Sequence, residues 1–268
     1  MSEFTAFEHD GWQRAALAYE QGFRPLTQQA IEPLLDAAGV RAGVRLLDLA
    51  SGPGDLSGAA VERGALVTGT DFSEAMIEIA RRRHPSVKFQ QADAQALPFE
   101  DTSFDAVTMA FLLGHLADPD VALREALRVL VHGGRVGFAW WQGFDRALAF
   151  GHVMAALQAH GNTDVGLPPG PPFDRFALAE ECRRSLKAAG FAHTVVVEAP
   201  LVWQPPSAEA AFETFMTGGV RTTAVLRAQT PEALARVRAA VLAALASYET
   251  ADGLAIPMPV WIASGRRP

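Results

Sequence analysis

The chain has 268 residues, of which 49% are hydrophobic and 20% charged, a composition typical of a globular protein with a sizeable core. Its formal net charge of -7 argues against nucleic acid as a partner, because an acidic protein repels a polyanion. The single cysteine, Cys182, excludes an internal disulfide framework and a cysteine-rich metal site, and we expect no bound metal.

The first residues show no basic segment followed by an apolar run, the pattern of a secretion signal. No later apolar stretch reaches the length needed to span a bilayer. The sequence therefore predicts a cytoplasmic protein without stable membrane insertion.

Apolar residues at helical spacing between Gly11 and Ala38 predict helices ahead of the core. At Val44 the pattern changes to a short apolar strand, a glycine-rich turn and a helix. This alternation then repeats, with strands expected at 44–49, 65–70, 87–91, 104–110 and 134–141, and helices at 73–83 and 120–130. Such alternation is typical of a parallel, doubly wound sheet with right-handed crossovers.

Beyond Trp141 the pattern becomes mostly helical around a Pro/Gly-rich loop at 166–172. Helices are expected at 147–159, 178–189, 207–216 and 231–248, and strands at 193–203 and 254–263, which we expect to pair. The predicted fold class is α/β, with a Rossmann-like, doubly wound, mostly parallel seven-stranded sheet and helical lid insertions.

The turn from Asp48 to Gly54 follows the first strand, at the edge where open α/β sheets bind ligands. Gly52 and Gly54 let the backbone approach a ligand closely, and the following helix presents unpaired N–H groups. A glycine turn is also an ordinary connection between a strand and a helix. Alone, it leaves both roles open.

Two further carboxylates follow the second and third strands. Asp71 can accept hydrogen bonds from both hydroxyls of a ribose. The alternative for Asp71 is a helix N-cap, a role that we assign to Ser73. Asp93, with the N–H of Ala94, can recognise the edge of adenine; the alternative is an Asx-turn.

Four segments, LLDLASGPG at 46–54, GTDFSEAM at 69–76, QADA at 91–94 and FDAV at 104–107, follow one another in a defined order and spacing. In both respects the chain resembles class I S-adenosylmethionine-dependent methyltransferases, in particular the ubiquinone/menaquinone-biosynthesis type and its small-molecule relatives. The resemblance covers residues 40–141 and extends more loosely over 173–268. At Ala50 the family usually has glycine, and alanine is tolerated there if this residue keeps a negative φ.

The resemblance implies S-adenosylmethionine as cofactor and S-adenosylhomocysteine as product. It also implies contacts to the methionine moiety, the ribose, the adenine and the amino-acid end of the cofactor. The methionine moiety is assigned to Asp48 and the backbone of Ala50, Ser51, Gly52 and Gly54, and the ribose to Asp71. The adenine is assigned to Phe72, Met76, Asp93 and Ala94. The amino-acid end is assigned to Ala110 and Phe111, with a hydrogen bond from Tyr19.

The implied activity is methyl transfer to a small, apolar or aromatic acceptor, with the reacting O, C or N atom left open. His115, after the fourth strand, is a candidate general base. The alternative is a loop histidine that packs on the next helix. Family members often carry two histidines here, and Gly114 replaces the first.

Two other functions stay open. The same topology hosts NAD-dependent oxidoreductases, whose pyrophosphate site requires Gly-x-Gly-x-x-Gly. This chain has Ser57 at the third position, and a carboxylate at Asp48 would repel a diphosphate. The other alternative is a protein that binds S-adenosylmethionine without transferring its methyl group.

The resemblance and the pattern together suggest five regions. They are an N-terminal helical cap at 1–40, a cofactor-binding Rossmann-like core at 41–144, a continuation of that core with the Pro/Gly loop and sixth strand at 145–206, a helical lid insertion at 207–250, and the final strand at 251–268. The expected partner is a small-molecule acceptor, and a homodimer is compatible with the sequence.

Overall fold

The computed structural model describes residues 2–268. The chain divides into two compact units, each assembled from three segments that alternate along the sequence. The core unit comprises Thr27–Trp141, Gly170–Ala199 and Val260–Pro268, and the helical unit comprises the residues up to Leu26, Gln142–Pro169 and Pro200–Pro259.

A seven-stranded sheet with the order β3-β2-β1-β4-β5-β11-β6 forms the centre of the core unit. Its strands are β1 (Arg45–Leu49), β2 (Leu66–Asp71), β3 (Lys88–Gln91), β4 (Phe104–Ala110), β5 (Leu130–Trp141), β6 (Ala192–Ala199) and β11 (Val260–Arg266). Strands β1 to β5 pair in parallel, whereas β11 runs antiparallel to both β5 and β6. The predicted fold class is confirmed.

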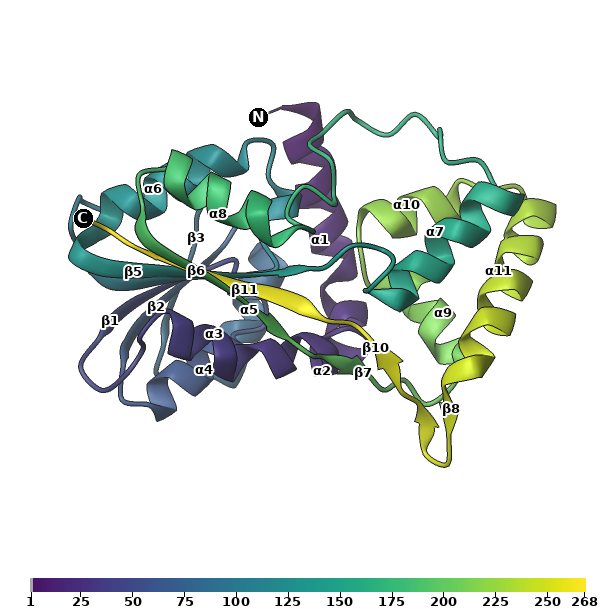
Figure 1. The fold of residues 1–268 in the computed structure, drawn as a ribbon, viewed down its shortest axis with the longest axis horizontal. Coiled ribbons are helices and arrows are strands. Elements are labelled where there is room, and N and C mark those ends of the chain that lie inside the picture. The colour runs from purple at the N-terminus through teal and green to yellow at the C-terminus, as the bar shows by residue number, and fades with distance from the viewer. Residues whose placement is uncertain (1) are drawn as a thin grey trace. The chain divides into compact units, whose positions relative to one another are not determined.

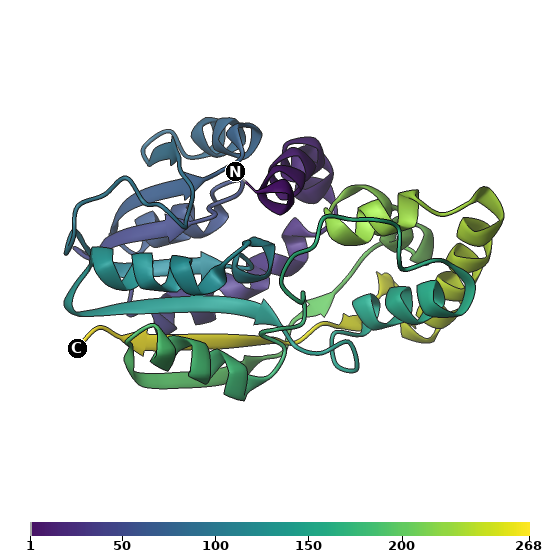
Figure 2. The same cartoon turned by 90° about the horizontal axis from the view of Figure 1, so that it is seen from above.

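Helices cover both faces of this sheet (Figure 1). On one face lie α6 (Pro119–Val129) and α8 (Ala179–Ala188), the face toward the viewer in Figure 2, and on the other lie α3 (Ile31–Ala37) and α4 (Asp55–Glu62). The core unit also contains α5 (Glu74–Arg83) and the short 3-10 helices η1 (Gln28–Ala30) and η2 (Leu113–His115). Because helices cover both faces, the central strands are largely buried, as Leu46, Leu47 and Val107 show.

The helical unit contains α1 (Glu3–Gln21), α7 (Leu148–His160), α9 (Ala208–Thr217), α10 (Arg221–Arg227), α11 (Pro231–Leu245) and η3 (Ala246–Tyr248). The short helix α2 (Arg24–Thr27) spans the boundary between the units. An aromatic cluster of Phe23, Phe150, Trp203 and Phe215 packs inside the helical unit, with Phe23 stacked on Trp203 at a centroid distance of 5.2 Å.

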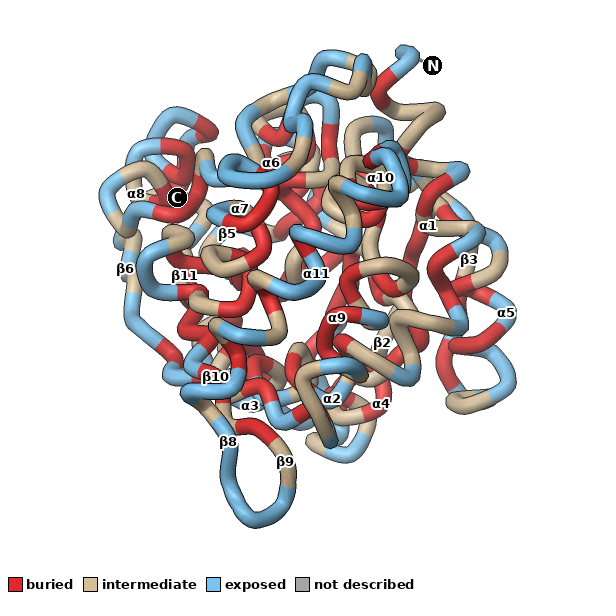
Figure 3. Tube along the Cα trace, turned by 90° about the vertical axis from the view of Figure 1, so that its right-hand side faces the viewer, coloured by how far each residue is buried: buried red, intermediate tan, exposed pale blue. Residues whose placement is uncertain are grey.

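Four short strands complete the helical unit: β7 (Val202–Trp203), β8 (Glu249–Thr250), β9 (Gly253–Leu254) and β10 (Ile256–Pro257). Strands β7 and β10 pair antiparallel, as do β8 and β9. The tip of the β8–β9 hairpin is exposed (Figure 3). Among residues 2–268, no helix has the length and apolar character required to cross a membrane.

Several predicted element boundaries were wrong. The strands expected at 193–203 and 254–263 do pair, but each is broken in two, as β6 with β7 and β10 with β11. Pro200 and Pro259 stand at these breaks, where proline removes the N–H that a continuous ladder needs. Strand β5 begins at Leu130 and not at Gly134, because Gly133 and Gly134 lie inside β5, where its register with β4 shifts. Helix α10 was not predicted.

Candidate functional site

The glycine turn connects β1 to α4 at the carboxyl end of the sheet, and β1 pairs with both β2 and β4 there. This is the switch point at which doubly wound sheets bind ligands. Gly52 has a φ of 51° and Gly54 a φ of 88°, so both use the left-handed region open to glycine. The turn is tied down by Ser51, whose N–H donates to the carbonyl of Thr70 at 2.8 Å.

The condition for tolerating alanine at position 50 is not met, because Ala50 has a φ of 54°. A left-handed conformation costs a residue with a Cβ about 1–2 kcal/mol. The alanine therefore occupies a position whose backbone suits the glycine found in the resembling family. The rest of the turn must stabilise this strained conformation.

Asp48 lies beneath the turn and is fully buried. One carboxylate oxygen accepts the Ser57 hydroxyl at 2.7 Å and the other accepts the Thr108 hydroxyl at 3.1 Å. Burial raises the pKa of Asp48 to about 7, against the opposing effect of these hydrogen bonds. Asp48 thus connects β1 to the start of α4 and to β4, and its predicted contact with the methionine moiety stays a prediction.

Asp71 connects the ends of β1 and β2. Its Oδ2 accepts the backbone N–H of Gly52 at 2.9 Å, and its Oδ1 accepts the N–H of Ser73 at 2.9 Å. The Ser73 hydroxyl accepts the N–H of Met76 at 3.3 Å, which confirms Ser73 as the N-cap of α5. Sequence reasoning missed the bond to Gly52, which positions the glycine turn.

The Ser51 hydroxyl is buried and has no hydrogen-bond partner among residues 2–268. An unsatisfied buried hydroxyl costs about 1–3 kcal/mol, and such a group at a functional turn indicates a missing partner. A Cβ built on Gly52 would meet no atom within 4 Å. The turn therefore combines an unsatisfied polar group with open space beside its backbone.

The predicted adenine-side residues lie around the ends of β2 and β3. The carbonyl of Phe72 accepts the side-chain amide of Gln91 at 2.8 Å, and Met76 is buried in α5. Asp93 forms the Asx-turn given as its alternative, because its Oδ1 accepts the N–H of Gln95 at 2.8 Å. Asp93 is exposed and Ala94 is buried. Their contacts with adenine stay predictions.

At the end of β4, Ala110 is followed by Phe111, which has a φ of 57°. The Phe111 N–H donates to the carbonyl of Ala139 at 3.0 Å, and its ring lies 4.4 Å from that of Trp141. Ala50 and Phe111 are thus two strained residues directly after the neighbouring strands β1 and β4. Strained backbone of this kind concentrates at ligand sites.

His115 is half-buried at the end of η2, between two aromatic rings. Its imidazole lies edge-to-face with Trp140 at 5.6 Å and with Phe173 at 5.8 Å between centroids. The Trp140 indole N–H donates to the carbonyl of Phe173 at 3.1 Å. The sequence did not predict either ring as a neighbour of His115, because both Trp140 and Phe173 lie far from His115 in the chain.

Gly114 is explained by the same indole. A Cβ on Gly114 would lie 2.0 Å from Cζ2 of Trp140, closer than any real contact. Trp140 therefore fills the space that a histidine at position 114 would need.

Tyr19 belongs to α1 in the helical unit, where its ring meets Trp12 edge-to-face at 5.7 Å. Its proposed hydrogen bond to the cofactor stays a prediction.

Among residues 2–268, no group of three or more His, Cys, Asp or Glu side chains is arranged to hold a metal ion.

Residues 47–138 match the family model described as a methyltransferase domain. This range runs from β1 into β5 and includes the glycine turn, Asp71, Asp93 and His115. Over this range the chain is similar to methyltransferase domains, in agreement with the resemblance found in the sequence.

The chain is also similar, over part of its length, to curated methyltransferases. The chain is 46% identical over 120 residues to a demethylmenaquinone methyltransferase of Clavibacter sepedonicus, covering 44% of this chain and 46% of the relative. It is 42% identical over 112 residues to the ubiquinone/menaquinone biosynthesis C-methyltransferase UbiE of Idiomarina loihiensis, covering 38% and 44%. The chain thus spans about half the length of these curated relatives.

Solved structures share the fold over nearly the whole chain. A methyltransferase from Thermotoga maritima aligns with a TM-score of 0.59 and 20% identity, covering 97% of this chain and 100% of that one. The [4+2]-cyclase SpnF aligns with a TM-score of 0.54 and 24% identity, covering 92% and 83%. At such identities the likeness shows the fold alone, and the fold hosts more than one kind of reaction.

Proposed function

We propose that this protein transfers a methyl group from S-adenosylmethionine to a small acceptor with an apolar or aromatic body. The observation that carries the proposal is the carboxylate of Asp71, which accepts the Gly52 N–H and so joins the glycine turn to the end of β2 inside a methyltransferase domain. That arrangement puts a negatively charged acceptor beside a backbone that a ligand can approach.

The residues of the turn fit the cofactor. The buried Ser51 hydroxyl lacks a partner among residues 2–268, and the space beside Gly52 is open. The carboxylate of Asp71 is a group that can accept hydrogen bonds from ribose hydroxyls. When bound, S-adenosylmethionine supplies an electrophilic methyl group on a positively charged sulfur.

The protein's own contribution is alignment and the exclusion of water. The surrounding structure holds Ala50 and Phe111 in strained backbone conformations, so the ends of β1 and β4 are fixed. The rings of Phe111 and Trp141 add an apolar surface at the end of β4. These features suit an acceptor that binds by its apolar body rather than by charge.

The acceptor class that we favour is a quinol-like aromatic ring, because the curated relatives are demethylmenaquinone methyltransferases and UbiE. His115 is the candidate base for such an acceptor. Its ring is held by Trp140 and Phe173, which limits its orientations and suits a group that must meet one reacting atom. The small-molecule acceptor, the absence of nucleic acid among partners, the cytoplasmic location and a homodimer stay predictions.

The electrostatic argument against a dinucleotide is weaker in the structure than in the sequence. Asp48 is buried beneath the turn, and burial raises the pKa of its carboxyl group to about 7. The preference for methyl transfer over NAD-dependent oxidation therefore rests on the matched domain and on the missing third glycine at Ser57.

The test combines binding with turnover. Calorimetry with S-adenosylhomocysteine and with NAD measures which ligand the purified protein prefers. Release of S-adenosylhomocysteine is then followed with S-adenosylmethionine and 1,4-naphthoquinol as acceptor. We expect binding of S-adenosylhomocysteine, no binding of NAD, and turnover. Preference for NAD would overturn the proposal, and binding without turnover on a panel of quinols, phenols and amines would favour the non-transferring alternative.

His115 has its own test once an acceptor is found. If His115 is the base, His115→Ala lowers kcat by about 10² or more, because general base catalysis contributes only along the reaction path. Binding of S-adenosylhomocysteine should be unchanged. Superimposable pH–rate profiles for the wild type and the variant would exclude His115 as the base.

A further inference from the structure

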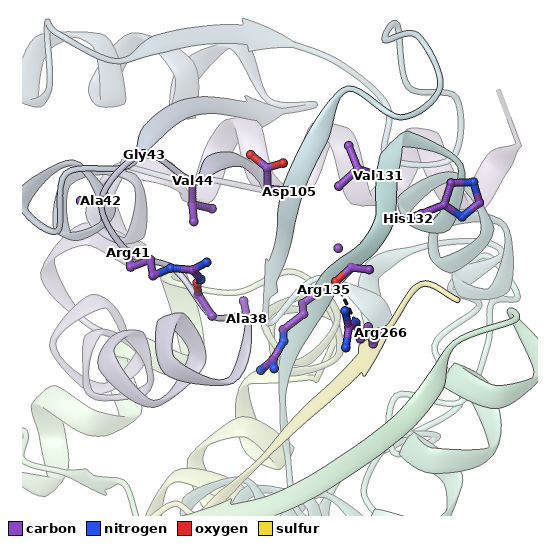
Figure 4. A pocket seen from close by; sticks show the side chains of 13 residues that line it. Ala38, Arg41, Ala42, Gly43, Val44, Asp105, Val131, His132, Arg135 and Arg266 are labelled. Atoms are coloured by element: carbon purple, nitrogen blue, oxygen red, sulfur yellow. Dashed lines mark hydrogen bonds between the residues drawn. The ribbon is translucent and has the colours of Figure 1, made fainter.

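A basic cavity of about 590 Å³ lies at the amino-terminal edge of the core unit's sheet (Figure 4). It is found where β1 and β4 begin, so it lies at the edge opposite the glycine turn. Arg41, His132, Arg135 and Arg266 are among its lining residues, and Asp105 is the one carboxylate among them. The protein as a whole carries a net charge of -7, so this concentration of arginines departs from its average surface.

Two of the arginines each lie beside Gly39. The Arg41 guanidinium donates to the carbonyl of Gly39 at 3.2 Å. Cδ of Arg135 lies 3.3 Å, and its Nη1 3.9 Å, from the position that a Cβ on Gly39 would take. Gly39 has a φ of 70°, which glycine adopts readily, and its lack of a side chain leaves room for Arg135.

The remaining arginine, Arg266, lies beside Arg135 on the neighbouring strand. Arg266 of β11 is the direct antiparallel partner of Arg135 in β5. Like charges at opposed positions of an antiparallel pair repel each other. Arg266 also donates through Nε to the carbonyl of Gly133 at 3.0 Å, which holds its guanidinium beside the cavity (Figure 4).

The one carboxylate in the lining is already engaged. Asp105 accepts two hydrogen bonds from the Arg45 guanidinium, at 2.9 and 3.0 Å, and a third from the Arg45 backbone N–H at 2.9 Å. This contact lowers the pKa of Asp105 and raises that of Arg45. The charge of Arg41 also helps to lower the pKa of Asp105, so Asp105 offsets part of the positive charge around the cavity.

We propose that this cavity binds the phosphate group of a small phosphorylated molecule. Guanidinium groups match phosphate oxygens with paired N–H donors, and a phosphate monoester near neutral pH carries the double charge that several arginines can balance. The cavity volume falls within the range of about 300–1,000 Å³ of small-molecule sites. The proposal is independent of the methyl-transfer function.

The test is calorimetry of the full chain with inorganic phosphate and with pyrophosphate, at low ionic strength. We expect both to bind, and Arg135→Ala to weaken each by about tenfold or more, because it removes a charge-assisted donor. Arg41→Ala should weaken them to a similar extent. Arg124→Ala removes the same charge from an exposed position on α6 outside the cavity and should leave both affinities unchanged.

Circular dichroism of each variant separates loss of binding from loss of fold. No binding of either anion to the wild type, or an equal loss in Arg124→Ala and Arg135→Ala, would overturn the proposal. Vesicles of phosphatidylcholine with and without phosphatidic acid test a lipid head group as the source of phosphate. Binding to the acidic vesicles alone, without binding of the soluble anions, would overturn a small-molecule site.

Discussion

Asp71 uses both carboxylate oxygens on backbone N–H groups, from Gly52 and from Ser73. Asp71→Asn keeps the size of the side chain but removes the charge. Affinity for S-adenosylhomocysteine should fall by about 1.5–3 kcal/mol, the value of a hydrogen bond to a charged group. Calorimetry measures the change, with Asp101→Asn, whose carboxylate is 72% exposed, as a control. Equal affinities for Asp71→Asn and the wild type would remove Asp71 from the ribose site.

Asp48 makes the stability of the fold depend on pH. Burial raises its pKa from 3.8 to about 7, so the unfolded chain releases this proton at a lower pH than the folded protein does. The contribution of Asp48 is therefore intact below about pH 4 and is lost as the pH rises toward 7, with a slope of at most about 1.4 kcal/mol per pH unit.

Asp48→Asn stays neutral across this window and should flatten that part of the curve. Urea denaturation of both proteins over the same pH range gives the two free energies of unfolding. We expect the variant to gain stability relative to the wild type as the pH rises. Parallel curves would show that Asp48 ionises equally easily in the folded and unfolded states.

At the scale of elements, the packing of η2 against β5 depends on the absence of a side chain at Gly114. A methyl group there would collide with the Trp140 indole. Gly114→Ala should destabilise the protein by about 1–3 kcal/mol, the usual cost of overpacking. Urea denaturation measures this cost, and Gly219→Ala, whose Cβ would have its nearest neighbour at 3.6 Å, is the control.

A double-mutant cycle assigns the cost to this contact. In a Trp140→Leu background the indole is gone, so Gly114→Ala should cost less than in the wild type. The same cost in both backgrounds would mean that the backbone of η2, and not the indole, requires glycine.

At the scale of the whole molecule, the sequence predicts a lid at residues 207–250, which in the structure contain α9, α10 and α11 of the helical unit. A lid that becomes ordered on binding loses protease sensitivity when ligand is added. Trypsin cleavage after Arg227, Arg236 and Arg238 should therefore slow with S-adenosylhomocysteine and not with NAD. Mass spectrometry of the fragments follows each site, and identical rates with and without S-adenosylhomocysteine would contradict the lid.

The order of elements in the core unit could be predicted because its signals are local. Apolar runs such as Leu46–Leu49 are buried on both faces by flanking helices, and glycine turns separate them from the next helix. The same local chemistry placed Asp48, Gly52 and Asp71 at strand ends, which is why the candidate site was visible in the sequence. The N-cap role of Ser73 is equally local, since its hydroxyl accepts an N–H three residues ahead.

Only the tertiary structure determined the contacts between residues that are far apart in the chain. The bond from Gly52 to Asp71, the Trp140 ring above Gly114 and the opposed pair Arg135 and Arg266 each depend on how separate strands align. Strand register is set by packing and pairing across the sheet, so no local pattern specifies it. The positive φ of Ala50 belongs here too: an isolated alanine disfavours that conformation, and only the surrounding turn, held by Thr70 and Asp71, imposes it.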